Sequence, residues 1–288
     1  MRYHVLRILP LLLCLAAACP VQAATLAEFA ERIGAEFPPP PGWSESMAEG
    51  NADPSAAHWG GRFGETLPGV TRRLPPSGID ATAPGDGPAP KTLALTLDAC
   101  GGRKGHSLDE EVLALLREHG IPATIFVTSL WLRSNRENAE ALAADPLFSL
   151  QAHGSRHKPA SVSGREIYGI KGTESVAALV QEVEGNARDI AAITGKRPRW
   201  YRSGTAYYDE VAIAVIRRLG FRIAGYSLNA DQGASLPEDE IAARLEKAAD
   251  RDIIICHLNR PGQPLAAALR RAIPLLLEQG FHFVPLPE

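Results

Sequence analysis

From Lys91 to the end of the chain, two kinds of hydrophobic pattern alternate. Seven short runs rich in β-branched and aromatic residues predict buried strands, at 92–99, 123–129, 148–155, 199–204, 222–230, 252–259 and 282–286. Between them, apolar residues recur every three or four positions and predict amphipathic helices, at 108–120, 175–195, 209–220 and 238–249. Repeated alternation of strand and helix predicts a parallel sheet, either closed as a barrel or open with helices on both faces.

Two helix starts are predicted from capping-box spacing. Ser107 lies three residues before Glu110, and Ser134 lies three residues before Glu137. In a capping box the serine accepts a backbone N–H of the first turn while the glutamate reaches back to the serine N–H. We therefore expect helices to begin at these two serines.

Polar side chains at the strand ends decide between the two kinds of sheet. Five predicted strands end in such residues, which are Asp98, His153, Arg202, Asn229 or Asp231, and His257. In a barrel the carboxyl ends of the strands converge on one mouth, where enzymes of this architecture place their catalytic groups, whereas an open sheet spreads them across its width. We therefore predict an α/β fold with a barrel of about seven parallel strands.

The first 90 residues lack this alternation. Residues 24–90 contain a short helical pattern and then stretches dense in Pro and Gly, which do not propagate helix or sheet. We interpret them as an extended N-terminal arm, with the barrel domain at 91–288.

Residues 1–23 have the pattern of a signal peptide. They combine a basic start, an apolar run too short to span a membrane, and small residues before the expected cleavage near Ala23 and Ala24. A lipoprotein site at Cys19 is the weaker alternative, because Leu15 lies one position too far upstream of the cysteine. We expect export to the periplasm or the medium, with no membrane span in the mature chain.

Composition changes this interpretation little. The 288 residues carry a formal net charge of −3, so nothing indicates a nucleic-acid partner. Removal of the signal peptide leaves two cysteines, Cys100 and Cys256. In an oxidising compartment they either form one bridge or remain two buried small apolar residues. We favour the second interpretation, because one pair makes no disulfide framework.

Two histidines four residues apart, His153 and His157, carry the first chemical signal. This spacing can place both imidazoles on one side of the chain, within reach of one metal ion. Asp98, Arg202 and His257 have ordinary structural alternatives: a turn carboxylate, an ion-pair partner and a hydrogen-bonded core histidine. The functional alternative for His257 is a general acid, because an imidazole beside a carboxylate titrates near neutral pH. Because all these residues lie at the carboxyl ends of predicted strands, we favour the functional interpretation over the structural one.

The motifs TLDACGG, HGSRH, WYRSGTAYYD, YSLNADQG and IIICHLN follow one another along the chain. Their order resembles the five ordered motifs of the polysaccharide deacetylases, carbohydrate esterase family four, which have the nodulation-protein-B homology domain. The resemblance covers about residues 91–288. It implies a distorted (β/α) barrel and a metal-dependent hydrolase that removes acetyl groups, above all N-acetyl groups, from an envelope or extracellular polysaccharide.

The resemblance also implies a role for each matching residue. Asp98 matches the general base, His257 the catalytic acid, and Arg202 the arginine that orients the base. His153 and His157 match two ligands of a divalent metal, usually zinc. The residues that it implies for the substrate and the oxyanion are Thr205, Ala206, Tyr207 and Asp231. Amide hydrolysis needs a polarised carbonyl, an activated water and a proton for the leaving amine, which a metal, a base and an acid supply.

One departure from the family concerns the metal. Its third protein ligand, a second aspartate, is replaced here by Ala99, which cannot bind a metal. Four alternatives stay open. Asp98 serves as a ligand rather than as the base, Cys100 binds as a thiolate on the same strand face, the two histidines hold the metal with water, or no metal binds.

Three functional hypotheses result. The first is a metal-dependent polysaccharide deacetylase, and the second is a catalytically inactive, glycan-binding relic of the same fold, motivated by Ala99. The third is a C–N hydrolase acting on a small amide or cyclic imide, since one fold hosts several chemistries. The joint presence of Asp98, Arg202 and His257 favours the first hypothesis. The expected partner is an acetylated polysaccharide or oligosaccharide, and the sequence leaves the oligomeric state open.

Overall fold

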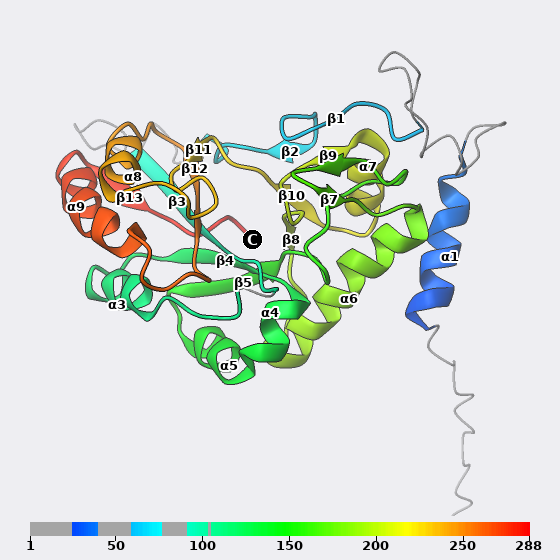
Figure 1. The fold of residues 1–288 in the computed structure, drawn as a ribbon, viewed down its shortest axis with the longest axis horizontal. Helices are drawn as coiled ribbons and strands as arrows, with labels where there is room; N and C mark the ends of the chain where they lie inside the picture. The colour runs from blue at the N-terminus through cyan, green and yellow to red at the C-terminus, as the bar shows by residue number, and fades with distance from the viewer. Residues whose placement is uncertain (1–24, 40–58, 77–90, 103–104) are drawn as a thin grey trace, which may run out of the picture.

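The computed structural model describes residues 25–39, 59–76, 91–102 and 105–288, and the expected signal peptide lies outside these residues. The main sheet contains β2 (Val70–Thr71), β3 (Lys91–Ala99), β4 (Ala123–Val127), β5 (Phe148–Ala152), β8 (Trp200–Tyr201), β10 (Arg222–Ala224), β11 (Leu228–Asn229), β12 (Asp252–His257) and β13 (Phe281–Phe283). Their order is β11-β12-β3-β4-β5-β8-β10-β2, with β13 beside the start of β3. All these pairings are parallel. The sheet curls into a half-barrel (Figure 1), which confirms the predicted α/β barrel of parallel strands.

The central strand, β3, separates two apolar layers because successive side chains of a strand point to opposite faces. Its odd-numbered residues from Leu93 to Ala99 belong to the large core between the sheet and the helices. Ala94 belongs instead to a smaller cluster that also contains Phe126. Thr96 and Asp98 have the parity of Ala94, so they face the inside of the curled sheet.

The helices pack against the outer face of the sheet. They are α3 (Glu110–Glu118), α4 (Ser129–Ser134), α5 (Arg136–Ala144), α6 (Val176–Thr194), α7 (Glu210–Arg218), α8 (Glu238–Leu245) and α9 (Leu265–Glu278). Their buried apolar residues join the large core, as the three-to-four-residue periodicity predicts. Within the part of the chain that the structure describes, no helix is both long and apolar enough to cross a membrane.

Both predicted capping boxes are wrong. The N-cap of α3 is Asp109, whose carboxylate accepts the Val112 N–H at 3.3 Å, and α5 begins after Asn135. The Ser134 hydroxyl lies 3.2 Å from His106 Nδ1, and the backbone carbonyl of Ser107 accepts the indole N–H of Trp131 at 3.1 Å. The Ser-x-x-Glu spacing therefore does not decide where these two helices begin.

The described parts of the N-terminal segment pack on the barrel. Helix α1 (Leu26–Glu36) begins with a capping box between Thr25 and Glu28, lies along α6 (Figure 1), and reaches α7 through an ion pair of Glu36 with Arg218. Further on, β1 (Phe63–Gly64) pairs antiparallel with β9 (Tyr208–Asp209), and β2 adds a strand beside β10. Part of the predicted arm is thus built into the edge of the barrel, and the domain boundary at residue 90 stays a prediction.

Candidate functional site

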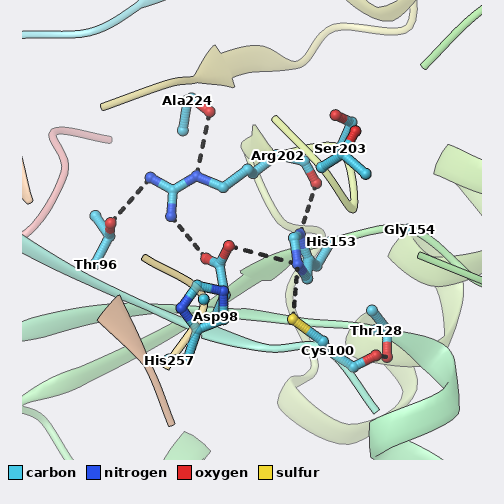
Figure 2. A network of polar contacts seen from close by, with 12 residues as sticks. Thr96, Asp98, Cys100, Thr128, His153, Gly154, Arg202, Ser203, Ala224 and His257 are labelled. Atoms are coloured by element: carbon cyan, nitrogen blue, oxygen red, sulfur yellow. Dashed lines mark hydrogen bonds and ion pairs between the residues drawn. The ribbon is translucent and has the colours of Figure 1, made fainter. Parts of the chain in front are cut away.

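Several side chains predicted at strand ends meet at the mouth of the half-barrel (Figure 2). Asp98 lies at the end of β3 and Cys100 just beyond it, while His153 directly follows β5. Arg202 follows β8, and His257 ends β12 in register with Asp98 on the neighbouring strand. The parallel topology therefore assembles the cluster from residues that lie far apart in the sequence.

Arg202 is fully buried, and several acceptors hold its guanidinium in place. It donates to Asp98 Oδ1 at 2.7 Å and to Thr96 Oγ1 at 2.9 Å. It also donates to the backbone carbonyls of Ala224, at 3.3 Å, and Gly225, at 3.0 Å. Such a fixed guanidinium holds the Asp98 carboxylate in one orientation.

The charge state of Asp98 is set by two opposing effects. Its burial disfavours the charged form, but the positive charge of Arg202, followed by those of His153 and His257, holds its pKa below the ordinary value. The carboxylate is therefore ionised near neutral pH. Its second oxygen, Oδ2, lies 3.5 Å from His153 Nε2.

The HGSRH loop is held by two side chains of α6 that sequence reasoning missed. Asn186 Oδ1 accepts the backbone N–H groups of His153, at 2.9 Å, and Gly154, at 3.0 Å. Glu182 accepts the N–H of Arg156 at 2.8 Å. Gly154 has a φ of +88°, and a Cβ there would come within 2.5 Å of the Glu182 carboxylate. The sequence did contain a signal for these two residues, because Glu182 and Asn186 are polar residues four apart on an otherwise apolar face of α6.

The hydrogen bond of His153 determines which ring nitrogen is available. Nδ1 lies 2.9 Å from the carbonyl oxygen of Arg202, so it donates there, and Nε2 is the nitrogen that faces Asp98 and Cys100. The ring of His157 packs edge-on against that of His153, with ring centres 5.0 Å apart. His157 adopts a φ of +61°, an uncommon conformation for a residue with a side chain.

Cys100 completes a group of metal-binding side chains with these two histidines. One ligand atom of each of Cys100, His153 and His157 lies within 4.8 Å of the others, and Cys100 Sγ is 3.7 Å from His153 Nε2. Burial disfavours the thiolate, but the positive charge of His157 and hydrogen bonds from the surrounding histidines hold the Cys100 pKa well below its ordinary value. A thiolate and two imidazoles form a donor set that zinc prefers, and three protein ligands are typical of catalytic zinc sites. The residues present thus fit a zinc ion.

The two cysteines of the barrel behave differently. Neither forms a disulfide, and Cys256 is fully buried in the large core, as predicted for a small apolar residue. For Cys100 that interpretation is wrong, because its sulfur faces the imidazoles.

His257 forms a pair with Asp231, which is fully buried. Asp231 Oδ1 lies 2.9 Å from His257 Nδ1, and Oδ2 accepts the backbone N–H of the same histidine at 2.6 Å. Burial disfavours the imidazolium, but the hydrogen bond with Asp231 raises the His257 pKa well above its ordinary value. Asp231, expected among the substrate residues, thus supports the predicted acid.

The three other residues predicted for the substrate form a tight turn after Arg202. Ala206 has a φ of +57° and donates its N–H to the Ser203 carbonyl at 3.0 Å. The Tyr207 N–H points to Thr205 Oγ1 at 3.4 Å, and its carbonyl accepts the Ser203 hydroxyl at 2.9 Å. The turn lies beside His157, since the Gly204 N–H donates to the carbonyl of Lys158, the next residue.

Comparison with known proteins agrees with this architecture. Residues 85–224 match the family model of the polysaccharide deacetylases, and no curated protein matches the chain. The fold is similar to that of the Bc1960 peptidoglycan N-acetylglucosamine deacetylase, at 20% identity over 70% of this chain and 89% of that chain, with a TM-score of 0.58. It is also similar to PdaA of Bacillus subtilis, a family 4 carbohydrate esterase, at 21% identity over 68% of this chain and 79% of that chain, with a TM-score of 0.56.

A third similar structure is wild-type BA3943 from Bacillus anthracis, a CE4 family pseudoenzyme. Identity is 19% over 68% of this chain and 64% of that chain, with a TM-score of 0.55, so the chain spans less than two thirds of BA3943. At such identities these likenesses show the fold alone. Together with the family match over residues 85–224, they confirm that the chain resembles the polysaccharide deacetylases, and they are consistent with a divergent member of that family.

Proposed function

We propose that the protein is a metal-dependent hydrolase that removes acetyl groups, N-acetyl above all, from an envelope or extracellular polysaccharide. One observation carries the proposal. A carboxylate fixed by Arg202 and an imidazole fixed by Asp231 lie on neighbouring strands beside the Cys100, His153 and His157 donor group. Two proteins of similar fold support it, because Bc1960 is a peptidoglycan N-acetylglucosamine deacetylase and PdaA is a family 4 carbohydrate esterase.

We assign the metal to Cys100, His153 and His157. Ala99 belongs to the core under the helices, whereas Cys100, two residues beyond Asp98, lies within hydrogen-bonding reach of His153. Asp98 is the poorer ligand, because it does not belong to the group whose ligand atoms lie within 4.8 Å of one another, and its Oδ1 is occupied by Arg202 at 2.7 Å. A divalent metal bound here would polarise the acetyl carbonyl and lower the pKa of a water molecule.

The chain's own groups supply the proton transfers. Asp98 is ionised, so it can accept a proton from the attacking water, and Arg202 keeps its carboxylate in place. His257 is held protonated by Asp231 and can donate a proton to the leaving amine. The backbone of residues 205–207, predicted to serve the oxyanion, remains the proposed contact for the acetyl oxygen.

A glycan-binding relic without catalysis is the second candidate, and Ala99 is the observation that favours it. Pseudoenzymes occur on this fold, since wild-type BA3943 is one, and a BA3943 mutant is described as having restored enzymatic activity. A hydrolase of small amides or imides has no observation of its own in its favour.

The proposed substrate agrees with the proposed location. Residues 1–23 have the pattern of a signal peptide, so we place the mature chain in the periplasm or the medium, where envelope polysaccharides lie.

Acetate release from N-acetylated glycans tests the proposal. The purified protein is assayed with and without a chelator, beside Asp98→Asn. We expect release by the wild type only, lost both in chelator and in the variant. Full activity in chelator would contradict the metal, and glycan binding without any acetate release would establish the relic instead.

A further inference from the structure

A small hairpin stands beside the site and carries an unusual turn. β6 (Glu166–Ile167) and β7 (Ile170–Lys171) pair antiparallel around the two residues Tyr168 and Gly169. Their φ values, +56° and +72°, are those of a type I′ turn, whose first central position favours Asn or Gly. A bulky aromatic residue there is a conformational outlier that local turn chemistry does not explain.

The Tyr168 side chain is also the most exposed large apolar side chain in the described part of the chain, at 70%. The other exposed large apolar side chains of this part of the chain, Leu275 and Leu277, lie on α9, far from β7 (Figure 1). Both the exposure of the Tyr168 ring and its disfavoured φ lower the stability of the fold. We therefore expect Tyr168 to have a binding role rather than a structural one.

The ring belongs to a group of aromatic side chains. It packs edge-on against Tyr207, with centres 5.7 Å apart, and Tyr207 in turn contacts Phe63, at 5.4 Å. The Tyr226 hydroxyl donates to Glu65 Oε2 at 3.0 Å, which adds a partly buried carboxylate beside these rings. Aromatic faces beside a carboxylate recognise a sugar ring well, because the C–H face meets the ring and the hydroxyls meet the carboxylate.

The aromatic group is continuous with the candidate active site. Tyr207 lies in the turn predicted for the oxyanion, and its carbonyl accepts the hydroxyl of Ser203, the residue after Arg202. The Tyr168 ring thus packs against the turn that follows Arg202, the partner of Asp98 in the site.

We infer that Tyr168, with Tyr207 and Glu65, forms a subsite for a second sugar ring of an N-acetylhexosamine chain, next to the ring that is deacetylated. This inference rests on the proposed function for the identity of the ligand. The hairpin holds Tyr168 as a platform, and the subsite makes the protein selective for chains over single sugars.

The test is binding of N-acetylglucosamine and its longer β-linked oligomers to the full chain, by calorimetry. Tyr168→Asn is the sharp variant, because Asn-Gly is the favoured type I′ pair, so the hairpin is kept while the ring is lost. Tyr168→Phe keeps the ring, and Leu275→Ala is the matched control for loss of exposed apolar surface elsewhere. Thermal unfolding verifies that Tyr168→Asn is at least as stable as the wild type.

We expect Tyr168→Asn to weaken binding of the longer oligomers about tenfold and leave the monosaccharide unchanged, with Tyr168→Phe and Leu275→Ala behaving as the wild type. Unchanged oligomer binding in Tyr168→Asn, or no oligomer binding by the wild type, would overturn the subsite. Acetate release is measured in parallel. Release that keeps its chain-length preference in Tyr168→Asn refutes the subsite but not the deacetylase, whereas ring-dependent binding without release refutes the deacetylase but not the subsite.

Discussion

Replacing Arg202 by methionine is the perturbation whose magnitude follows most directly from the structure. The substitution keeps an unbranched side chain beside the Phe126 ring, 4.3 Å from the guanidinium carbon, but removes the positive charge. Asp98, only 3% exposed, then stays buried without its partner. Removing one member of a buried ion pair costs about 3–5 kcal/mol of the free energy of unfolding, because the remaining charge is uncompensated. We expect that loss near neutral pH.

The loss should shrink on acidification. In the wild type, Arg202 lowers the Asp98 pKa, so the ion pair stabilises the fold above the unfolded-state value of 3.8 and loses this effect as the pH falls through the folded-state pKa. In Arg202→Met, only His153 and His257 oppose the effect of burial, so the Asp98 pKa is raised relative to the wild type. Lowering the pH through that raised pKa neutralises the carboxylate and restores part of the variant's stability.

The assay is denaturant unfolding of both proteins at about pH 7 and about pH 5, in chelator so that metal binding does not contribute. Arg62→Met is the control, because Arg62 forms an exposed ion pair with Glu210 and we expect no measurable change there. A loss in Arg202→Met no greater than in the control, or one that grows as the pH falls, would refute the reasoning.

Three further predictions concern the surroundings of the site. Asn186→Ala removes the acceptor of the Gly154 N–H and one of the two acceptors of the His153 N–H, whose other acceptor is the Val127 carbonyl. Unfolding and zinc titration should therefore show a loss of about 1–3 kcal/mol in stability and weaker zinc binding, and unchanged zinc affinity would argue against a positioning role for Asn186. Tyr201→Phe removes a buried hydroxyl without a partner among the described residues, so the free energy of unfolding should stay equal or rise by up to about 1 kcal/mol, and a clear loss would reveal an unseen partner. Asp231→Asn removes the charge that raises the His257 pKa, so the alkaline limb of the deacetylation pH profile should move to lower pH; a limb that stays in place would exclude His257 as the acid.

The hydrophobic pattern predicted the barrel because its long strands carry a strong signal. β3 and β12 are continuous apolar runs, and both were located from the sequence. β2 was missed, because its two residues, Val70 and Thr71, lie in a segment rich in Pro and Gly and gain strand geometry only by pairing with β10. The predicted start of α3 was wrong for a similar reason. Its N-cap is Asp109 and not Ser107, and local spacing does not reveal that difference.

The site was partly predictable. Strand-end position predicted that Asp98, Arg202 and His257 lie together. In the structure, His257 is in register with Asp98 on the neighbouring strand, and Arg202 reaches Asp98 across the inside of the curled sheet. The sequence left the third metal ligand open, because the choice depends on which way the chain turns after Ala99. The pairing of Asp231 with His257 depends on how the loop after β11 folds back onto β12, and residue spacing does not reveal that.

We propose that Cys100 replaces the missing aspartate as the third metal ligand. Cobalt(II) substitution tests it directly, because a cobalt–thiolate bond gives an intense charge-transfer band in the near ultraviolet. Cys256→Ser is the matched control, since that cysteine is free but buried in the core.

We predict the charge-transfer band in the wild type and in Cys256→Ser, and its loss in Cys100→Ser. We also expect Cys100→Ser to lower the affinity for zinc by about a hundredfold or more, because even the loss of a residue that only supports a metal ligand lowers metal affinity by about 10–100-fold. Cobalt bound at His153 and His157 without the band, or no metal bound at all, would contradict the account.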